Sequence, residues 1–144
     1  MTTFWIGVAS RDHVLAGVEG GFCQLNHGKS APLGRIKPGD RIVYYSPREQ
    51  MRAGATVQAF TAIGEILDGE PRLALMPGGF TPYRRDVRFY TATEAPIAPL
   101  LPLLSFTRGR SSWGIAFRRG SFKIERDDYL TIARAMGVVD DANI

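Results

Sequence analysis

Two stretches of the sequence decide how the fold is interpreted: residues 22–29, FCQLNHGK, and residues 39–47, GDRIVYYSP. In the second stretch, the turn at Pro38-Gly39 introduces a β-strand over residues 41–45, and Pro47 is expected to end it because proline cannot donate to a strand ladder. The first stretch places an aromatic ring, two amides, an imidazole and a lysine within eight residues. Aromatic faces beside hydrogen-bonding groups are what a site for a flat polar ring requires. The stretch is therefore expected to build a binding pocket.

Aromatic, β-branched and alternating runs predict further strands around this stretch. They fall at residues 3–9, 57–66, 72–76, 85–91 and 120–124. The first strand should place Phe4 and Ile6 on one face of the sheet and Trp5 on the other. The strands at 57–66 and 72–76 are separated by the turn residues 68–71, which predicts a hairpin between them.

Cap residues predict two helices. The first should begin at Ser10 or Asp12 and stop at Gly20, and the second should cover residues 125–136, opened by acidic side chains. Residues 96–104 contain too many prolines for a long helix and are interpreted as an apolar cover. Residues 138–144 are expected to form a loose tail.

These elements predict an α+β fold in a single domain over residues 1–144. Five or six short strands with small helices between them favour a curled, β-barrel-like sheet with helical covers. A chain of 144 residues with 44% hydrophobic residues is long enough to close one core. The single cysteine, Cys23, cannot form an internal disulfide, and no apolar stretch has membrane-spanning length. A cytoplasmic protein without a membrane partner is expected.

Positive charge is concentrated in the second half of the chain. Residues 1–80 contain eight basic and seven acidic residues, whereas residues 83–126 contain nine basic and three acidic residues, and eight of those nine are arginines. Arginine suits phosphate and planar-base recognition because its guanidinium both forks and stacks, although arginines that serve only solubility remain an alternative. The candidate phosphate-binding residues are Lys29, Arg84, Arg85, Arg110, Arg118 and Arg119.

The order of these motifs resembles the EVE domain, a member of the PUA-like superfamily related to YTH domains. The resemblance is carried by residues 4–14, FWIGVASRDHV, residues 21–24, GFCQ, residues 27–29, HGK, and residues 44–47, YYSP. It extends through Phe89-Tyr90, Ser105-Phe106, Trp113 and residues 117–122, FRRGSF. It therefore covers almost the whole chain.

The resemblance implies a PUA-like twisted β-barrel and a concave site that receives one flipped, modified nucleobase of DNA or RNA without chemistry on it. A flipped base must regain lost stacking, and an aromatic platform contributes roughly 1–3 kcal/mol per base. The candidate pocket residues are Ser10, Phe22, Gln24, Asn26, His27, Gly28, Tyr45, Ser46 and Trp113. Since neighbouring residues of a strand point to opposite faces, Tyr45 is assigned to the pocket and Tyr44 to the core.

Two other functions remain open. An enzyme acting on nucleic acid or nucleotides could use Asp12, His13 and His27, but the sequence has no nucleophile elbow and no phosphate-binding glycine loop. A protein adaptor could use residues 96–104 if they form an exposed apolar patch. Two distant histidines and one cysteine lack the spacing of a zinc site, so neither a metal nor another cofactor is expected.

Overall fold

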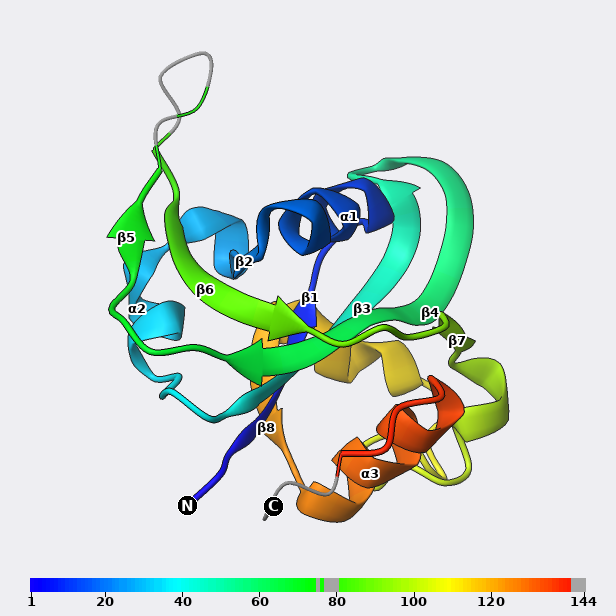
Figure 1. Ribbon diagram of the computed structural model, residues 1–144. Helices are drawn as coiled ribbons and strands as arrows, with labels where there is room; N and C mark the ends of the chain where they lie inside the picture. Colours follow the sequence, from blue (N-terminus) through cyan, green and yellow to red (C-terminus); the bar gives the residue numbers. More distant parts are fainter. Residues whose placement is uncertain (75, 77–80, 141–144) are drawn as a thin grey trace.

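The computed structural model describes every residue except 75, 77–80 and 141–144, and its centre is a curled mixed sheet (Figure 1). Six strands follow one another in the order β2-β6-β4-β3-β1-β8, while β5 pairs with β6 and β7 pairs with β4. The strands are β1 (Phe4–Val8), β2 (Phe22–Cys23), β3 (Arg41–Gln50), β4 (Ala53–Ile66), β5 (Arg72–Leu73), β6 (Tyr83–Phe89), β7 (Ala95–Pro96) and β8 (Ser121–Ile124). The sheet forms a half-barrel.

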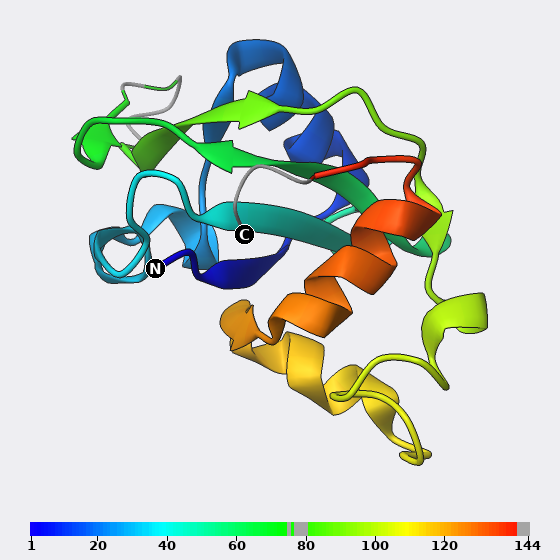
Figure 2. The same cartoon turned by 60° about the horizontal axis from the view of Figure 1, so that its bottom comes forward.

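Helices cover both faces of this sheet (Figure 2). They are α1 (Arg11–Gly20), α2 (Ser30–Gly34), α3 (Arg126–Ala135) and the 3₁₀ helices η1 (Asn26–Gly28), η3 (Ala98–Leu100) and η4 (Trp113–Arg119). Buried residues of α1 and α2 belong to one hydrophobic cluster, and those of α3, η3 and η4 belong to another. The predicted α+β class, with a PUA-like curled sheet and small covering helices, is confirmed.

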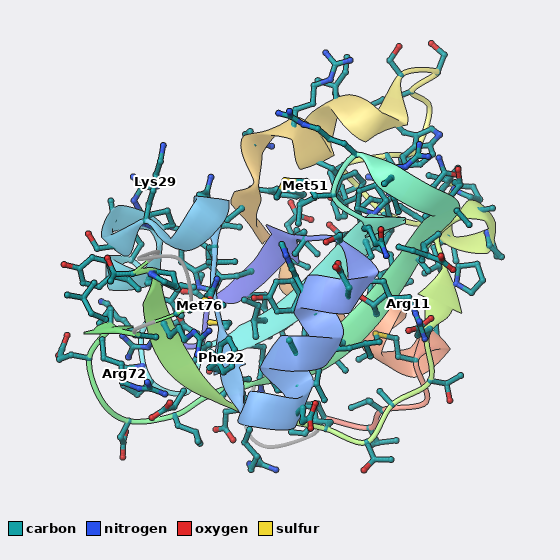
Figure 3. The ribbon with its side chains drawn as sticks, turned by 90° about the horizontal axis from the view of Figure 1, so that it is seen from above. Arg11, Phe22, Lys29, Met51, Arg72 and Met76 are labelled. Atoms are coloured by element: carbon teal, nitrogen blue, oxygen red, sulfur yellow. The ribbon has the colours of Figure 1, made fainter. Side chains whose placement is uncertain are left out.

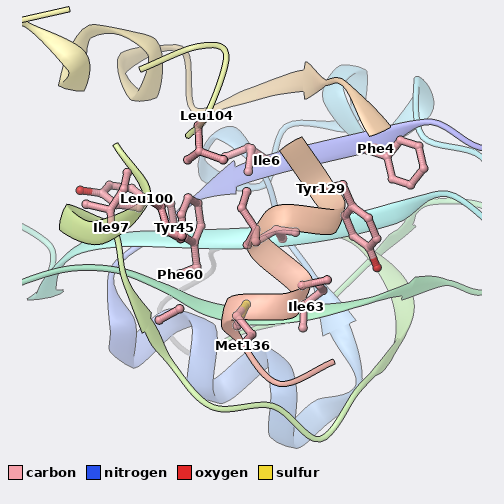
Figure 4. Close-up of a cluster of buried hydrophobic side chains, with 14 of the residues drawn as sticks. Phe4, Ile6, Tyr45, Phe60, Ile63, Ile97, Leu100, Leu104, Tyr129 and Met136 are labelled. Carbon is pink, nitrogen blue, oxygen red and sulfur yellow. The ribbon is translucent and has the colours of Figure 1, made fainter. Parts of the chain in front are cut away.

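The side chains of β1 alternate between the two clusters, as its sequence predicts. Phe4 and Ile6 lie in the cluster beneath α3, where the Phe4 ring is 4.7 Å from that of Tyr129 (Figure 4). Trp5 lies in the opposite cluster, and its indole N–H donates to a carboxylate oxygen of Asp40 over 3.0 Å. The strand runs parallel to β3 and antiparallel to β8, so it is buried within the sheet.

The strand that begins at Arg41 does not end at Pro47. It continues to Gln50, and its pairing with β4 shifts register between Ser46 and Arg48. Proline is tolerated at such an irregularity because no ladder hydrogen bond needs its missing N–H. The expected end of the strand is therefore wrong, and β3 and β4 instead form a long hairpin whose tip lies beyond the sheet.

The predicted hairpin between residues 57–66 and 72–76 is also wrong. The strand β4 pairs with β3 on one side and with β6 on the other, while β5 pairs with β6. Gly64 allows this close approach of β6, because a Cβ atom there would lie 2.6 Å from the carbonyl oxygen of Arg88. Part of the predicted 72–76 strand, residue 75, lies outside the described residues.

Residues 97–104 and the segment after α3 both pack against the cluster beneath α3. Ile97, Leu100 and Leu104 are buried in it, as an apolar cover requires, whereas Leu103 is 57% exposed. The large apolar side chains of residues 96–104 therefore supply little of the exposed patch that the adaptor interpretation needs. The expected loose tail is corrected at Asp140, because the carboxylate of Asp140 pairs with Arg41 at 2.6 Å. The remaining tail residues, 141–144, lie outside the described part of the chain.

Candidate functional site

A cavity of about 690 Å³ lies at one end of the sheet. It lies among α1, β2, β6, the β3–β4 hairpin and the end of η4. In Figure 3, Phe22 and Met76 lie close together, Met51 lies near the hairpin tip, and Lys29 points outward at the edge of the molecule. The cavity is lined by residues 8–10, 13, 16, 17, 22, 24, 26, 44, 47, 48, 50–52, 76, 84 and 117–120.

One wall of the cavity is built on Phe22 and Arg84. The strands β2 and β6 pair here, and the guanidinium carbon of Arg84 lies 3.8 Å from the centre of the Phe22 ring. The Nε of Arg84 donates to Oε1 of Gln24 over 2.6 Å, and its Nη2 lies 3.3 Å from the sulfur of Met76. Burial, followed by the like charge of Arg72, lowers the pKa of Arg84. The wall therefore presents a partly desolvated cation and an amide together.

Of the two adjacent tyrosines, Tyr44 is buried in the core as predicted but also lines the cavity, whereas Tyr45, predicted to line it, does not. Tyr44 lines the cavity, and its hydroxyl accepts from the backbone N–H of Gln24 over 3.0 Å and donates to the carbonyl of Gln24 over 2.8 Å. Burial raises the pKa of the Tyr44 hydroxyl well above its usual value, so this hydroxyl stays protonated. Tyr45 instead stacks on Phe117 in the core at 4.0 Å between ring centres, and Phe117 forms part of the cavity wall. Tyr45 therefore supports that wall from behind.

The start of α1 brings Ser10 and His13 to the cavity. The hydroxyl of Ser10 donates to Oδ1 of Asp12 over 2.5 Å, and the same oxygen accepts from the backbone N–H of His13. The hydrogen bond from Ser10 is the main cause that lowers the pKa of Asp12. Asp12 is exposed and does not line the cavity, so its carboxylate acts by orienting Ser10.

Asn26 lines the cavity and connects two distant segments. Its Nδ2 donates to the carbonyl of Arg119 over 3.0 Å, and its Oδ1 accepts from the hydroxyl of Ser121 over 2.8 Å. Gly120 lies against this amide, since a Cβ atom at Gly120 would be 2.6 Å from Nδ2. The amide of Asn26 therefore holds the segment after η4 in place.

The rim of the cavity is strongly positive. Its charged side chains are those of Arg48, Arg52, Arg84, Arg118 and Arg119, and no aspartate or glutamate is among the described lining residues. Five guanidinium groups with no acidic neighbour in the lining favour an anionic ligand. The tip residues Arg48 and Arg52 belong to the β3–β4 hairpin, which extends past Pro47.

Several predicted site residues lie elsewhere. Ser46 is fully buried, and its hydroxyl pairs with that of Thr61 over 2.8 Å. Arg85 is also buried, because it points to the opposite side of β6 from Arg84. Gly28 is buried in η1 and Lys29 is exposed beyond it, and neither lines the cavity. These four residues are corrected as cavity or phosphate contacts.

Three further predicted residues are not among the described lining residues of the cavity. Trp113 and Arg110 do not line this cavity but line a second hollow beside η4. The side chain of His27 lies outside what the structure describes. The cavity thus brings together Ser10, Phe22, Gln24, Asn26, Arg84, Arg118 and Arg119 from the predicted set.

Sequence reasoning missed Tyr44, Phe117 and the hairpin tip. Extending the predicted strand past Pro47 would have placed a turn near Gly54, the next glycine in the sequence. In the structure Arg52 and Gly54 have the positive φ angles of a tight turn, 58° and 77°. Phe117 gives no such signal, since an aromatic residue in the 117–122 run fits the core equally well.

Two kinds of feature are absent from the described part of the chain. It contains no group of three or more histidine, cysteine or acidic side chains placed to hold a metal ion. None of the helices in residues 1–74, 76 and 81–140 is long and apolar enough to cross a membrane. Cys23 is buried, and this burial raises the pKa of its thiol to about 12, so it is not a reactive nucleophile.

A comparison with protein families matches residues 3–135 to the EVE domain. The chain belongs to the EVE domain family. This EVE domain is 53% identical over 139 residues to the UPF0310 protein msl3206 of Mesorhizobium japonicum, covering 95% of this chain and 93% of that protein. It is 44% identical over 137 residues to the UPF0310 protein YdcG of Bacillus subtilis, covering 95% and 94%. Neither name denotes an enzyme.

The fold of this EVE domain is shared with a YTH domain. The YTH domain of the Zygosaccharomyces rouxii MRB1 protein, solved in complex with N6-methyladenosine RNA, aligns with a TM-score of 0.63. The alignment covers 96% of this chain and 89% of that one at 15% sequence identity. At this identity the likeness concerns the fold, and it confirms the PUA-like architecture expected from the sequence.

Proposed function

We propose that this EVE domain is a non-catalytic nucleic-acid binding module that receives one flipped, modified nucleobase in the 690 Å³ cavity. The arginine rim contacts the phosphates on either side of that base. The module needs no cofactor and acts in the cytoplasm on single-stranded or locally opened DNA or RNA.

The observation that carries this proposal is the combination of groups in one cavity. Aromatic rings of Phe22, Tyr44 and Phe117 line the same hollow as five arginines. Its volume falls within the range of about 300–1,000 Å³ usual for small-ligand pockets. A nucleotide has the same two parts, a flat polar ring and an attached anion, so it matches both the apolar interior and the positive rim.

Hydrogen-bonding groups in the cavity can distinguish one base from another. Gln24 is held by Tyr44 through its backbone and by Arg84 through its Oε1, and no described residue accepts from its Nε2. This amide N–H₂ is therefore available to donate to an acceptor on the edge of a base. Met51 and Met76 add adaptable apolar surface where a methyl group on the base would fit.

The YTH neighbour supports the same function. That protein shares the fold and was solved with methylated RNA bound. A base drawn from a strand into a pocket loses stacking energy, which the rings of the cavity would restore. Ser10, Asp12 and His13 take part in no chemical step of this function.

Calorimetric titration tests the proposal with 9-residue single strands of DNA and of RNA that differ only in one central base, adenine or N6-methyladenine and cytosine or 5-methylcytosine. We expect at least tenfold tighter binding of one modified strand, and a preference that persists as salt weakens the overall affinity. If all strands bind with equal affinity and this affinity is lost completely at high salt, the protein contacts only the phosphates and the proposal is wrong.

A matched pair of variants locates the binding in the cavity. Gln24→Ala should reduce the preference for the modified base about tenfold, because the amide that contacts the base edge is removed. Gln58→Ala, at an exposed position outside the cavity, is the control and should retain the preference. The same loss in both variants would place the bound base somewhere else.

A further inference from the structure

A second hollow of about 570 Å³ lies beside η4. It is lined by Phe106, Gly109, Arg110, Ser111, Ser112, Trp113, Ile115, Ala116 and Arg119. Ile115 is 56% exposed, and Trp113 packs only partly against the core. The hollow therefore combines an accessible indole ring with apolar surface, two arginines and two hydroxyls.

The two hollows share one wall. Arg119 lines both hollows. Phe117 lines the cavity and also contacts Trp113 of the second hollow edge to face, with 6.3 Å between the ring centres. Asn26 fixes this wall by donating to the carbonyl of Arg119. Consecutive parts of one ligand can therefore occupy both hollows with Arg119 between them.

The composition of the second hollow favours the same class of ligand as the cavity. Arg110 and Arg119 supply positive charge, and the described lining contains no acidic side chain. When a base flips out of a strand, its neighbour loses a stacking partner and gains from a new aromatic face. The phosphate that links the two nucleotides is anionic, which suits a guanidinium between the two hollows.

We propose that the hollow beside Trp113 binds the nucleobase next to the one in the cavity, so that the domain recognises a short strand and not an isolated base. This inference rests on the proposed function. Trp113 supplies the stacking face, and Arg119 meets the linking phosphate. An acidic peptide would satisfy the same arginines, but it would not use the indole face next to a base-sized cavity, and it serves as a competing ligand in the test.

Tryptophan fluorescence tests the inference directly. The chain has two tryptophans, and Trp5 is only 5% exposed with its N–H bonded to Asp40, so quenching by a ligand reports on Trp113. The ligands are 5-residue RNA and DNA strands with central N6-methyladenine or 5-methylcytosine, the corresponding 5′-monophosphate nucleotides, and a pentaglutamate peptide. Strands should quench the fluorescence, whereas mononucleotides and the peptide should leave it nearly unchanged.

Variants of Trp113 separate stacking from structure. Trp113→Ala should weaken binding of the 5-residue strand about tenfold and change mononucleotide binding less than twofold. Trp113→Phe keeps an aromatic ring and should stay within threefold of wild type for both ligands. Equal loss of strand and mononucleotide binding in Trp113→Ala, no loss of either, or quenching by the peptide would overturn the inference.

The same titrations distinguish failure of this inference from failure of the proposed function. A modified-base preference that depends on Gln24 but not on Trp113 overturns only the second subsite. If no strand with a modified base binds more tightly and Gln24→Ala binds as the wild type does, both the proposed function and this inference are wrong.

Discussion

Arg84 covers the ring of Phe22, with its guanidinium carbon 3.8 Å from the ring centre, and at the same time donates to Gln24. The cation is therefore held in the cavity wall by a ring beneath it and an amide beside it. A guanidinium fixed in this way offers a flat outer face for stacking and N–H groups for a phosphate. This pair connects the aromatic interior to the positive rim.

Replacing Arg84 should weaken binding through charge as well as stacking. We expect Arg84→Ala to reduce the affinity for a modified 9-residue strand about tenfold and to lower the slope of log affinity against log salt by about one. Calorimetry at four salt concentrations measures both quantities. The control is Arg134→Ala, an exposed position on α3 away from the cavity, which should change affinity less than twofold. A similar loss in both variants would mean that net charge alone governs binding.

Tyr44 and Tyr45 form a matched pair for testing the inner wall. Tyr44→Phe removes the hydroxyl that holds both backbone groups of Gln24, so we expect a loss of about 1–3 kcal/mol of stability and at least fivefold weaker binding. Tyr45→Phe removes a hydroxyl that makes no hydrogen bond with the described residues, so less than about 0.5 kcal/mol should be lost. Urea unfolding and titration of both variants check this. A larger loss in Tyr45→Phe would show that its hydroxyl makes a hydrogen bond in the folded protein.

The two tyrosines show where sequence reasoning reached its limit. Alternation along a strand correctly predicts that Tyr44 and Tyr45 face opposite sides, but it does not say which side holds the cavity. The same alternation correctly predicted that Trp5 lies on the opposite face of β1 from Phe4 and Ile6. No choice between a core face and a cavity face was needed there, because a hydrophobic cluster covers each face of β1. The side on which a hollow lies depends on how distant elements such as η4 close over the sheet.

The arginines show the same limit. Composition correctly drew attention to the second half of the chain, where Arg84, Arg118 and Arg119 line the cavity. It could not separate Arg84 from Arg85, whose side chains leave opposite faces of β6. It also missed Arg48 and Arg52, since Pro47 was expected to end the strand that carries them to the cavity. The register shift between β3 and β4 that accommodates Pro47 depends on how the two strands pair, and the local sequence does not reveal it.

Gly120 tests whether the wall shared by the two hollows must keep its shape. Its φ of 77° disfavours a side chain, and a Cβ atom would lie 2.6 Å from the amide of Asn26. Gly120→Ala should therefore cost about 1–3 kcal/mol of stability and weaken strand binding, because Asn26 must move. Gly114→Ala, inside the 3₁₀ helix η4 that ends just before Gly120, is the control, since no atom lies within 4 Å of the added methyl group. Thermal unfolding that shows equal losses for both glycines would contradict this account.

The buried pair of Arg41 and Asp140 joins the end of the chain to the sheet. Their side chains are 4% and 3% exposed, their charged atoms lie 2.6 Å apart, and the hydroxyls of Tyr129 and Tyr90 also donate to Asp140 over 2.5 and 3.3 Å. We expect Asp140→Asn to cost about 3–5 kcal/mol, because it leaves Arg41 buried with only the more distant Glu65, at 3.6 Å, as a counter-charge. Urea unfolding at pH 7 measures the loss. Asp68→Asn, at an exposed position, is the control and should cost less than about 0.5 kcal/mol.

The same pair predicts how stability depends on pH. Burial alone would raise the pKa of Asp140, but the hydrogen bonds from Arg41 and Tyr129 outweigh it and hold the pKa below its usual value. A carboxyl with a lowered pKa in the folded state stabilises the fold above its unfolded pKa, and this contribution is lost as the pH falls through the folded value. The difference in unfolding free energy between wild type and Asp140→Asn should therefore be constant from about pH 7 to pH 5 and narrow below that. Parallel curves for the two proteins down to about pH 2.5 would show that Asp140 is not ionised against Arg41 in the folded protein.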